Sequence, residues 1–379
     1  MKTMSSIQLS FLGTVLSLTS GAFAQLPVTA SSATVVASGL NDPRGLAFDQ
    51  AGALYIAEAG TGGTTSTAGT CTQGLPPIGP YTGGPSARIS RLAPNGKLTV
   101  LATGFPSFVA LQGDIIGVAD LAFLDGKLYA LIGGGGCSHG NPNLPNGIVS
   151  VNLNNGSWNY IVNLSLFYME HPAAYPDATD FEPDGVPYSL IANNGQLIAV
   201  EPNHGTITAT TPNGATREIF DFSFPFGHVV PTSIAAREGN LYLGNLGLFP
   251  ISSQWERITT LSKDLGFFDT TPGLATKPQD LNNFRVAGSR AGFTTVVALK
   301  FGPDGLLYAL ELSDTPGGFP NPGDGKVVRL NADGQIQTVV TGLSLPGSMA
   351  FGPDRALYIS NNGDLGPGKG QILRVDIPM

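Results

Sequence analysis

Five oxygen-bearing side chains recur at equivalent positions of a repeated pattern, each three residues after a tyrosine or isoleucine in an apolar run. They are Glu58, Glu201, Asn245, Glu311 and Asn361, and Ile132 occupies the sixth such position. If the runs are strands around one axis, these oxygens converge, and carboxylate and amide oxygens are ligands that Ca²⁺ takes. Repetition at one position is also typical of a structural role, in which each side chain caps backbone N–H groups of its own loop. The repetition favours the structural role, with a Ca²⁺ site as the alternative.

Two histidines could add acid–base chemistry at the same end of the molecule. His204 follows Glu201 and Asn203, and His228 lies in the connection to the next repeat, so the two could approach each other over the central axis. A histidine there could act as a general base or as a metal ligand. A loop histidine that only forms hydrogen bonds is the commoner case. His204 and His228 are therefore catalytic candidates with a structural alternative.

The run Gly136-Cys137-Ser138-His139-Gly140 has the Gly-x-Ser-x-Gly form of a nucleophile elbow. That elbow needs a strand, a sharp turn and then a helix. The segment that follows contains Pro142 and Pro145 and has no helical pattern. We therefore predict that Ser138 is not a catalytic nucleophile.

The N-terminus and the cysteines together indicate an oxidising compartment. Lys2, an apolar run and then Ala22-Phe23-Ala24 are typical of a secretory signal peptide cleaved before Gln25. The sequence contains two cysteines, Cys71 and Cys137. In such a compartment an isolated pair is more often a disulfide than a redox or metal site. We predict a signal peptide over residues 1–24, a secreted or periplasmic location, and a Cys71–Cys137 disulfide.

One stretch, Phe293 to Leu343, contains a complete copy of the repeated unit. Two β-rich runs flank Pro303-Asp304-Gly305 and two more flank Asp333-Gly334, which predicts two hairpins and hence a four-stranded antiparallel sheet. Such a sheet has two apolar faces, so neighbouring copies must stack to bury them. Copies stacked radially form a β-propeller.

Leu-Tyr or Leu-Ile pairs identify six first hairpins and predict six blades. The hairpins span residues 46–58, 118–132, 187–201, 231–245, 296–311 and 347–361. The sixth blade has one further strand, Gln371 to Asp376, and TVVASGL, which ends at Leu40, matches the fourth-strand text TVVTGL that ends at Leu343. We expect one all-β domain over residues 25–379, a six-bladed β-propeller closed by pairing of the N-terminal strand with the C-terminal blade. An insertion over residues 263–282 interrupts the fourth blade and has no assigned structure.

The pattern divides the connections between two faces. Tight turns such as Asp125-Gly126 lie on one face, and the other receives the long loops over residues 59–87, 133–146, 165–186, 313–325 and 362–370. The histidines and cysteines fall on this second face, which we call the loop-rich face. Because binding residues usually lie on long loops of a rigid scaffold, we expect function there.

Composition excludes some partners. The chain has 379 residues, of which 12% are charged, and 51 glycines and 29 prolines, a profile typical of turn-rich β proteins. Its formal net charge of -8 comes without a basic cluster. We therefore expect no nucleic-acid binding, and we predict a monomer without a transmembrane segment.

Several motifs resemble the ScyD/ScyE family, secreted six-bladed propeller-like proteins named for members in cyanobacterial scytonemin pigment clusters. The matching segments keep their order along nearly the whole chain and include Pro43 to Phe48, Leu54 to Gly60, Val230 to Ala235 and Leu357 to Asn361. The sequence departs from the family at the insertion and at Tyr188-Ser189, where relatives more often have Tyr-Gly. The resemblance implies the fold but no activity, because the family has none established.

At the level of the repeat, the chain is also similar to NHL-repeat proteins and to six-bladed lactonases of the gluconolactonase and strictosidine synthase type. Those lactonases hold Ca²⁺ at the channel mouth with Glu, Asn and Asp side chains. Carried to this sequence, the similarity selects Glu58, Asn245 and Glu311.

We therefore expect a binding or scaffold module that takes a small molecule, a glycan or a partner protein on the loop-rich face. The alternative is a Ca²⁺-dependent, lactonase- or esterase-like hydrolase in which Glu58, Glu201, Asn245 and Glu311 bind the metal. His204 or His228 would then transfer the proton. A quinone-dependent sugar dehydrogenase has similar blades but would need a basic, histidine-lined pocket, which this sequence does not indicate.

Overall fold

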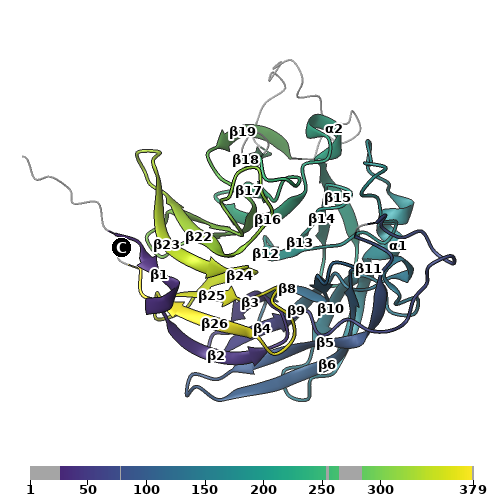
Figure 1. Ribbon diagram of the computed structural model, residues 1–379, viewed down its shortest axis with the longest axis horizontal. Coiled ribbons are helices and arrows are strands. Elements are labelled where there is room, and N and C mark those ends of the chain that lie inside the picture. Colours follow the sequence, from purple (N-terminus) through teal and green to yellow (C-terminus); the bar gives the residue numbers. More distant parts are fainter. Residues whose placement is uncertain (1–25, 77, 253–255, 264–283, 378–379) are drawn as a thin grey trace, which may run out of the picture.

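The computed structural model describes residues 26–76, 78–252, 256–263 and 284–377. Six sheets surround a central axis, and each sheet is one blade of a propeller, as Figure 1 shows. The predicted all-β, six-bladed fold is confirmed. The predicted signal peptide, residues 1–24, and residues 264–282 of the insertion lie outside the described residues.

The strands of each blade follow one another from the axis to the rim. Blade one contains β3 (Pro43–Phe48), β4 (Leu54–Glu58), β5 (Thr82–Leu92) and β6 (Leu98–Val109), and blade two contains β8 (Val118–Leu124), β9 (Lys127–Ile132), β10 (Gly147–Val151) and β11 (Trp158–Asn163). Blade three contains β12 (Ser189–Asn193), β13 (Gln196–Glu201), β14 (Thr206–Thr210) and β15 (Thr216–Asp221), and blade four contains β16 (Pro231–Arg237), β17 (Asn240–Asn245), β18 (Arg257–Ser262) and β19 (Arg285–Ala291). Blade five contains β20 (Val296–Phe301), β21 (Leu307–Glu311), β22 (Pro322–Leu330) and β23 (Ile336–Ser344).

Blade six is built from both ends of the described chain. β24 (Ser348–Phe351), β25 (Leu357–Asn361) and β26 (Gly370–Val375) supply three strands, and β2 (Thr34–Leu40) supplies the fourth. β2 runs antiparallel to β26, with Val35 opposite Leu373. The predicted closure is therefore confirmed. It leaves no open end of the ring, because each blade now has a neighbour on both sides.

The tyrosine of the Leu-Tyr pairs recurs because it packs against the neighbouring blade. The tyrosine in the second strand of one blade meets a phenylalanine in the first strand of the next, edge to face, with centroids about 5 Å apart. These pairs are Tyr55–Phe123, Tyr242–Phe301, Tyr308–Phe351 and, across the closure, Tyr358–Phe48. Edge-to-face pairs add to the burial of the rings themselves. The repeated motif thus holds blades together rather than marking a reactive site.

Several short elements were not predicted. β1 (Val28–Thr29) pairs parallel with β23, beside which it lies in Figure 1, and β7 (Ile115–Ile116) extends the sheet of blade one. The helices α1 (Leu164–Glu170) and α2 (Ser223–Phe226) and the 3₁₀ turns η1 (Ala30–Ser32) and η2 (Cys137–His139) lie in connections. In the described part of the chain, no helix has the length and apolar character needed to cross a membrane.

A matched pair of substitutions in β2 tests the closure. Leu40 is fully buried, whereas Val35 is 51% exposed. We expect Leu40→Ala to lower the free energy of unfolding by about 2–5 kcal/mol, because it leaves a cavity between blades. Val35→Ala should change it by less than about 0.5 kcal/mol. Urea denaturation measures both, and equal effects would contradict the closed ring.

Candidate functional site

The five polar side chains at the ends of the second strands, which we call the latch, hold neighbouring backbone in place by hydrogen bonds. Each bonds the segment that leads into the first strand of its own blade, which we call the lead-in segment. Glu58 accepts from Asn41 N (2.7 Å), Glu201 from Val186 N (2.7 Å), Glu311 from Thr294 Oγ1 (2.9 Å) and Asn361 from Ser344 N (2.8 Å), while Asn245 donates to Val229 O (3.0 Å). All five side chains are at least 95% buried. The side chains therefore bond the lead-in segments, and only three of these five bonds, those of Glu58, Glu201 and Asn361, are the expected caps of backbone N–H groups.

The latch bonds are needed because the lead-in segments adopt an unfavourable backbone conformation. Four lead-in segments contain a residue other than glycine in the left-handed region: Asp42 (φ 49°), Val230 (φ 55°), Thr295 (φ 41°) and Leu345 (φ 42°). This conformation is costly, above all for the β-branched Val230 and Thr295. The strand-end side chain and a backbone bond hold it, as when Leu246 N donates to Val230 O (2.9 Å). Blade two has Ile132 instead and uses the backbone bond alone, from Gly133 N to Gly117 O (2.9 Å).

The predicted metal ligands are therefore engaged with protein groups. Glu58 also accepts from Arg88 Nη2 (2.7 Å) and Ser90 Oγ (2.5 Å), and Lys326 Nζ lies 3.3 Å from Glu311. Among the residues that the structure describes, no group of three or more His, Cys, Asp and Glu side chains could hold a metal ion. A Ca²⁺ ion on this ring would have to displace several hydrogen bonds.

The predicted catalytic histidines both bond the segment around Glu182. His204 donates through Nε2 to Glu182 O (2.8 Å), and its ring is stacked on Phe181 and buried. His228 Nε2 lies 2.7 Å from Asp180 Oδ2. Burial opposes protonation, but the bond to Asp180 raises the pKa of His228 above its ordinary value. The structure brings the two histidines to one segment without a hydrogen bond between them.

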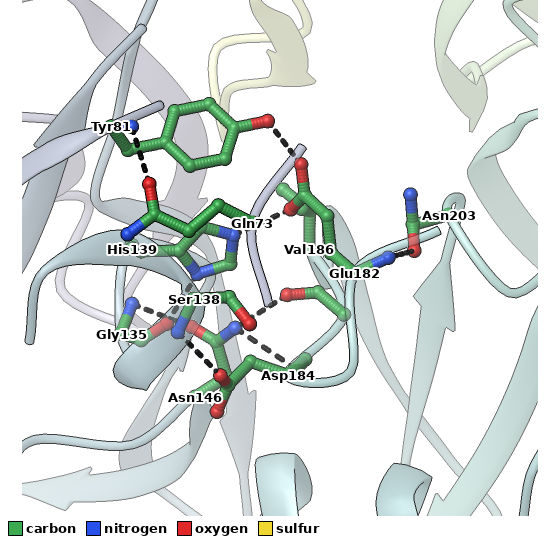
Figure 2. Close-up of polar contacts among 12 residues, drawn as sticks. Gln73, Tyr81, Gly135, Ser138, His139, Asn146, Glu182, Asp184, Val186 and Asn203 are labelled. Carbon is green, nitrogen blue, oxygen red and sulfur yellow. Dashed lines mark hydrogen bonds and ion pairs between the residues drawn. The ribbon is translucent and has the colours of Figure 1, made fainter. Parts of the chain in front are cut away.

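A third histidine forms the centre of a buried ionic cluster, shown in Figure 2. His139 Nδ1 lies 2.5 Å from Gly135 O, and Nε2 lies 2.6 Å from Glu182 Oε2. A carbonyl oxygen can only accept a hydrogen bond, so Nδ1 carries a proton, and the bond from Nε2 to the Glu182 carboxyl favours the charged imidazolium form of His139. Burial opposes this charge, but Glu182 raises the pKa of His139. Tyr81 donates its hydroxyl to the other Glu182 oxygen, and Phe108 stacks on the ring of His139 (4.4 Å).

The Gly-x-Ser-x-Gly segment lacks the strand, turn and α-helix of a nucleophile elbow, because Cys137–His139 form the short 3₁₀ turn η2 between β9 and β10. Ser138 N donates to Asp184 Oδ2 (2.8 Å), and its buried hydroxyl has no hydrogen-bond partner in the described chain. Both ring nitrogens of the adjacent His139 are bonded to Gly135 O and Glu182, so neither is free to take a proton from Ser138. The motif is a folded connection rather than a reactive one.

The predicted disulfide is confirmed and fastens this cluster. Cys71 and Cys137 are bonded, with Cα atoms 5.9 Å apart. Cys137 directly precedes Ser138 and His139, and Thr67 donates its hydroxyl to Cys137 O. The long connection between β4 and β5 is thereby tied to the connection between β9 and β10. The loops of blades one and two form one rigid block.

The mouth of the axis carries a charged group that sequence analysis missed. Arg44 Nη2 donates to Ile115 O (2.8 Å) and lies 3.6 Å from Asp364 Oδ1. Burial, with the neighbouring Asp114 carboxyl, raises the pKa of Asp364 to about 7, although Arg44 opposes this. The only sequence signal was Pro43-Arg44-Gly45 at the start of a first strand.

Below this mouth the axis is nearly filled. Asp120, Ser189, Lys300 and Ser348 line a cavity of about 10 Å³, enough for a single water. A Cβ on Gly45 would lie only 2.1 Å from Asp120 Oδ1, which shows how closely the first strands approach one another. This cavity is too small for an organic substrate.

A larger hollow lies in blade four. A cavity of about 150 Å³ is enclosed by α2 and its flanks together with β16, β17 and β18. Its walls are mostly apolar, and they were not predicted from the sequence. The cavity opens beside the connection between blades three and four, which belongs to the loop-rich face.

Comparison with known proteins supports the fold alone. No protein-family model matches the chain, and no curated protein matches its sequence. Regucalcin from Agrobacterium tumefaciens, described as a calcium-binding protein, is 13% identical, with coverage of 91% of this chain and 94% of that one and a TM-score of 0.52. An oxidoreductase assigned as a glucose dehydrogenase in Thermus thermophilus is 17% identical, with coverage of 90% and 98% and a TM-score of 0.54. A Bacteroides thetaiotaomicron protein of unknown function is 12% identical, with coverage of 92% and 74% and a TM-score of 0.54.

Removing the acidic partner tests the charge on His139. Because the pKa of His139 is raised on folding, the ion pair stabilises the fold fully below about pH 6.5, and this contribution is lost as pH rises through the raised pKa. We expect Glu182→Gln to lower the free energy of unfolding by about 3–5 kcal/mol near pH 6, and by less at higher pH.

Urea denaturation across a pH series measures this loss. Glu170→Gln, which changes an exposed carboxylate at the end of α1, is the control and should have little effect. A loss for Glu182→Gln that stays constant with pH would mean that the pair is neutral.

The disulfide should contribute strongly to stability. It closes a loop of 66 residues, which corresponds to about 4 kcal/mol from chain entropy. We expect the double variant Cys71→Ser, Cys137→Ser to lose about 2–5 kcal/mol in urea denaturation. Reductant should destabilise the wild type and leave the variant unchanged. Equal sensitivity of the two proteins would contradict this role.

Proposed function

We propose that this chain is a protein-binding propeller whose loop-rich face takes a basic, partly apolar partner outside the cytosol. The observation that carries this proposal is the placement of exposed large apolar side chains. Those on connections of this face, which we call the apolar rim, are Leu75, Leu111, Leu166, Met169, Tyr175, Leu248, Phe249 and Phe319. Elsewhere in the described chain, such side chains are Leu26 near its start and Val35 and Val100 on outermost strands. Exposed apolar surface gathered on one face is typical of an interaction site.

The apolar rim is held in place before any partner arrives. Phe249 and Phe319 lie on different blades with ring centroids 5.9 Å apart. Their loops are joined by backbone bonds from Ile251 N to Gly318 O (2.9 Å) and from Gly317 N to Ile251 O (2.8 Å). Tyr175 stacks on Phe224 in the same way (5.9 Å). Pre-ordered side chains lose little conformational entropy on binding, which supports a binding role.

Charge on this face favours a basic partner. Glu170 and Asp314 are exposed, and Asp177 and Asp180 are half-buried, on the same loops as the apolar rim. Two cations of this face, Arg88 and Lys326, are paired with Glu58 (2.7 Å) and Asp314 (2.9 Å). A surface with excess carboxylates attracts a partner of opposite charge and guides its orientation.

The Ca²⁺-dependent lactonase is the second candidate. Its support is the propeller fold shared with regucalcin, which is described as a calcium-binding protein. Against it stand the latch bonds of the strand-end oxygens and the small volume, about 10 Å³, of the cavity that Asp120 and Lys300 line. A hydrolase needs a cavity at its reacting groups, so the binding role is the better supported of the two.

Location outside the cytosol is part of the proposal. A disulfide such as Cys71–Cys137 persists in an oxidising compartment and is rare in reducing ones. Together with the N-terminal motif Ala22-Phe23-Ala24, it favours export.

Paired surface variants test the binding role. Immobilised wild-type protein should retain specific proteins from the extracellular fraction of its source, and about 1 M salt should weaken that retention. Phe249→Ser with Phe319→Ser should reduce retention more than tenfold, since buried aromatic anchors carry much of the binding energy. The control, Val35→Thr with Val100→Thr, removes exposed apolar surface from outermost strands and should retain the same proteins. Equal loss in both variants would refute the proposed face.

Calorimetry and a lactone hydrolysis assay distinguish the Ca²⁺-dependent lactonase from the binding role. We expect Ca²⁺ to give no stoichiometric binding heat, and a sugar lactone to be hydrolysed no faster with the protein than without it. Stoichiometric binding together with lactone hydrolysis that a chelator abolishes would establish the hydrolase instead.

A further inference from the structure

The cavity in blade four has walls of two kinds. Phe222, Pro225, Phe226, Val229, Pro231 and Leu243 form the apolar part, and Asn245, Arg257 and Thr259 form the polar part. Phe222, Pro225, Phe226 and Val229 come from the connection between blades three and four, whereas Pro231, Leu243 and the polar residues come from the first three strands of blade four. The cavity therefore lies where two structural units meet, as ligand sites often do.

The walls are fixed by contacts within the protein. Phe222 packs edge to face on Phe220 (4.9 Å) and lies nearly parallel to Phe226 (5.5 Å, 29°). Asn245 joins the two walls, because Nδ2 donates to Val229 O (3.0 Å) while Oδ1 accepts from Arg257 N (2.9 Å). A cavity held open in this way needs little rearrangement to accept a ligand.

The volume of the cavity in blade four, about 150 Å³, limits the size of a ligand that it can hold. An apolar cavity of that size holds a benzene ring, whereas sites for larger organic ligands enclose roughly 300–1,000 Å³. Phe222 and Phe226 pack on each other and together form one aromatic wall, against which a flat ring can lie in an offset or edge-to-face contact. The Thr259 hydroxyl can both donate and accept a hydrogen bond, so it suits a hydroxyl substituent on that ring.

We infer that this cavity is a binding site for a small phenol, a single aromatic ring that carries one hydroxyl group. The site is distinct from the apolar rim, and its occupation does not depend on the partner proposed above. The ring lies among Phe222, Phe226 and Leu243, and its hydroxyl is directed to Thr259.

A titration with p-cresol tests the site. Methyl NMR should show shifts at Val229 and Leu243, with a dissociation constant of about 1 mM for so small a ligand. The saturated analogue 4-methylcyclohexanol should bind about 2- to 12-fold more weakly, since it lacks the aromatic contacts. Shifts only at methyl groups outside the cavity, or none, would overturn the inference.

Two variants separate the ring from its hydroxyl. Val229→Phe fills the cavity and should abolish binding of p-cresol. Thr259→Val keeps the volume, so it should weaken p-cresol about 2- to 12-fold and leave toluene binding unchanged. Circular dichroism and thermal melting confirm that each variant is folded. Undiminished p-cresol binding in the folded variants would refute the assigned site.

Discussion

The constraint on which this structure depends is that no blade can bury its own two apolar faces. Each sheet must be covered on both sides, and only a closed ring supplies two neighbours to every member. The tyrosines of the second strands show how directly this acts, because each contact such as Tyr55–Phe123 joins one blade to the next. The last of these, Tyr358–Phe48, joins opposite ends of the chain. The tyrosines that recur in the second strands are therefore explained by packing at four of the contacts between blades.

Packing around an axis also requires sharp turns, and polar side chains are needed to form hydrogen bonds with the backbone groups of those turns. The chain must turn sharply before each first strand, and residues such as Val230 and Thr295 adopt left-handed conformations there. Glu58, Glu201 and Asn361 satisfy the backbone groups of these turns and are buried as a result. Side chains that look like a ring of metal ligands in the sequence thus hold the loops that surround the axis. What remains for recognition lies farther out, on the loops themselves.

The repeat explains why so much of the fold could be predicted. The six hairpins, the pairing of Val35 with Leu373 and the Cys71–Cys137 disulfide all follow from local patterns or from simple pairing. Features that arise from several distant segments could not be predicted. His139 and Glu182 lie in connections with no shared pattern, and Arg44 meets Asp364 only because the ring closes. The cavity in blade four depends on volumes left between two connections, which no periodicity records.

The pairing of β2 with β26 has a consequence for synthesis. β2 is made before any strand of blades one to five, yet it is partnered last, because Leu373 is made near the end of translation. Until then β2 is an unpaired edge that other chains could join, and long-range pairing of this kind forms slowly. The disulfide between blades one and two involves residues made much earlier. An early strand therefore waits for its partner through most of synthesis, and during that time edge-to-edge association with other chains competes with ring closure.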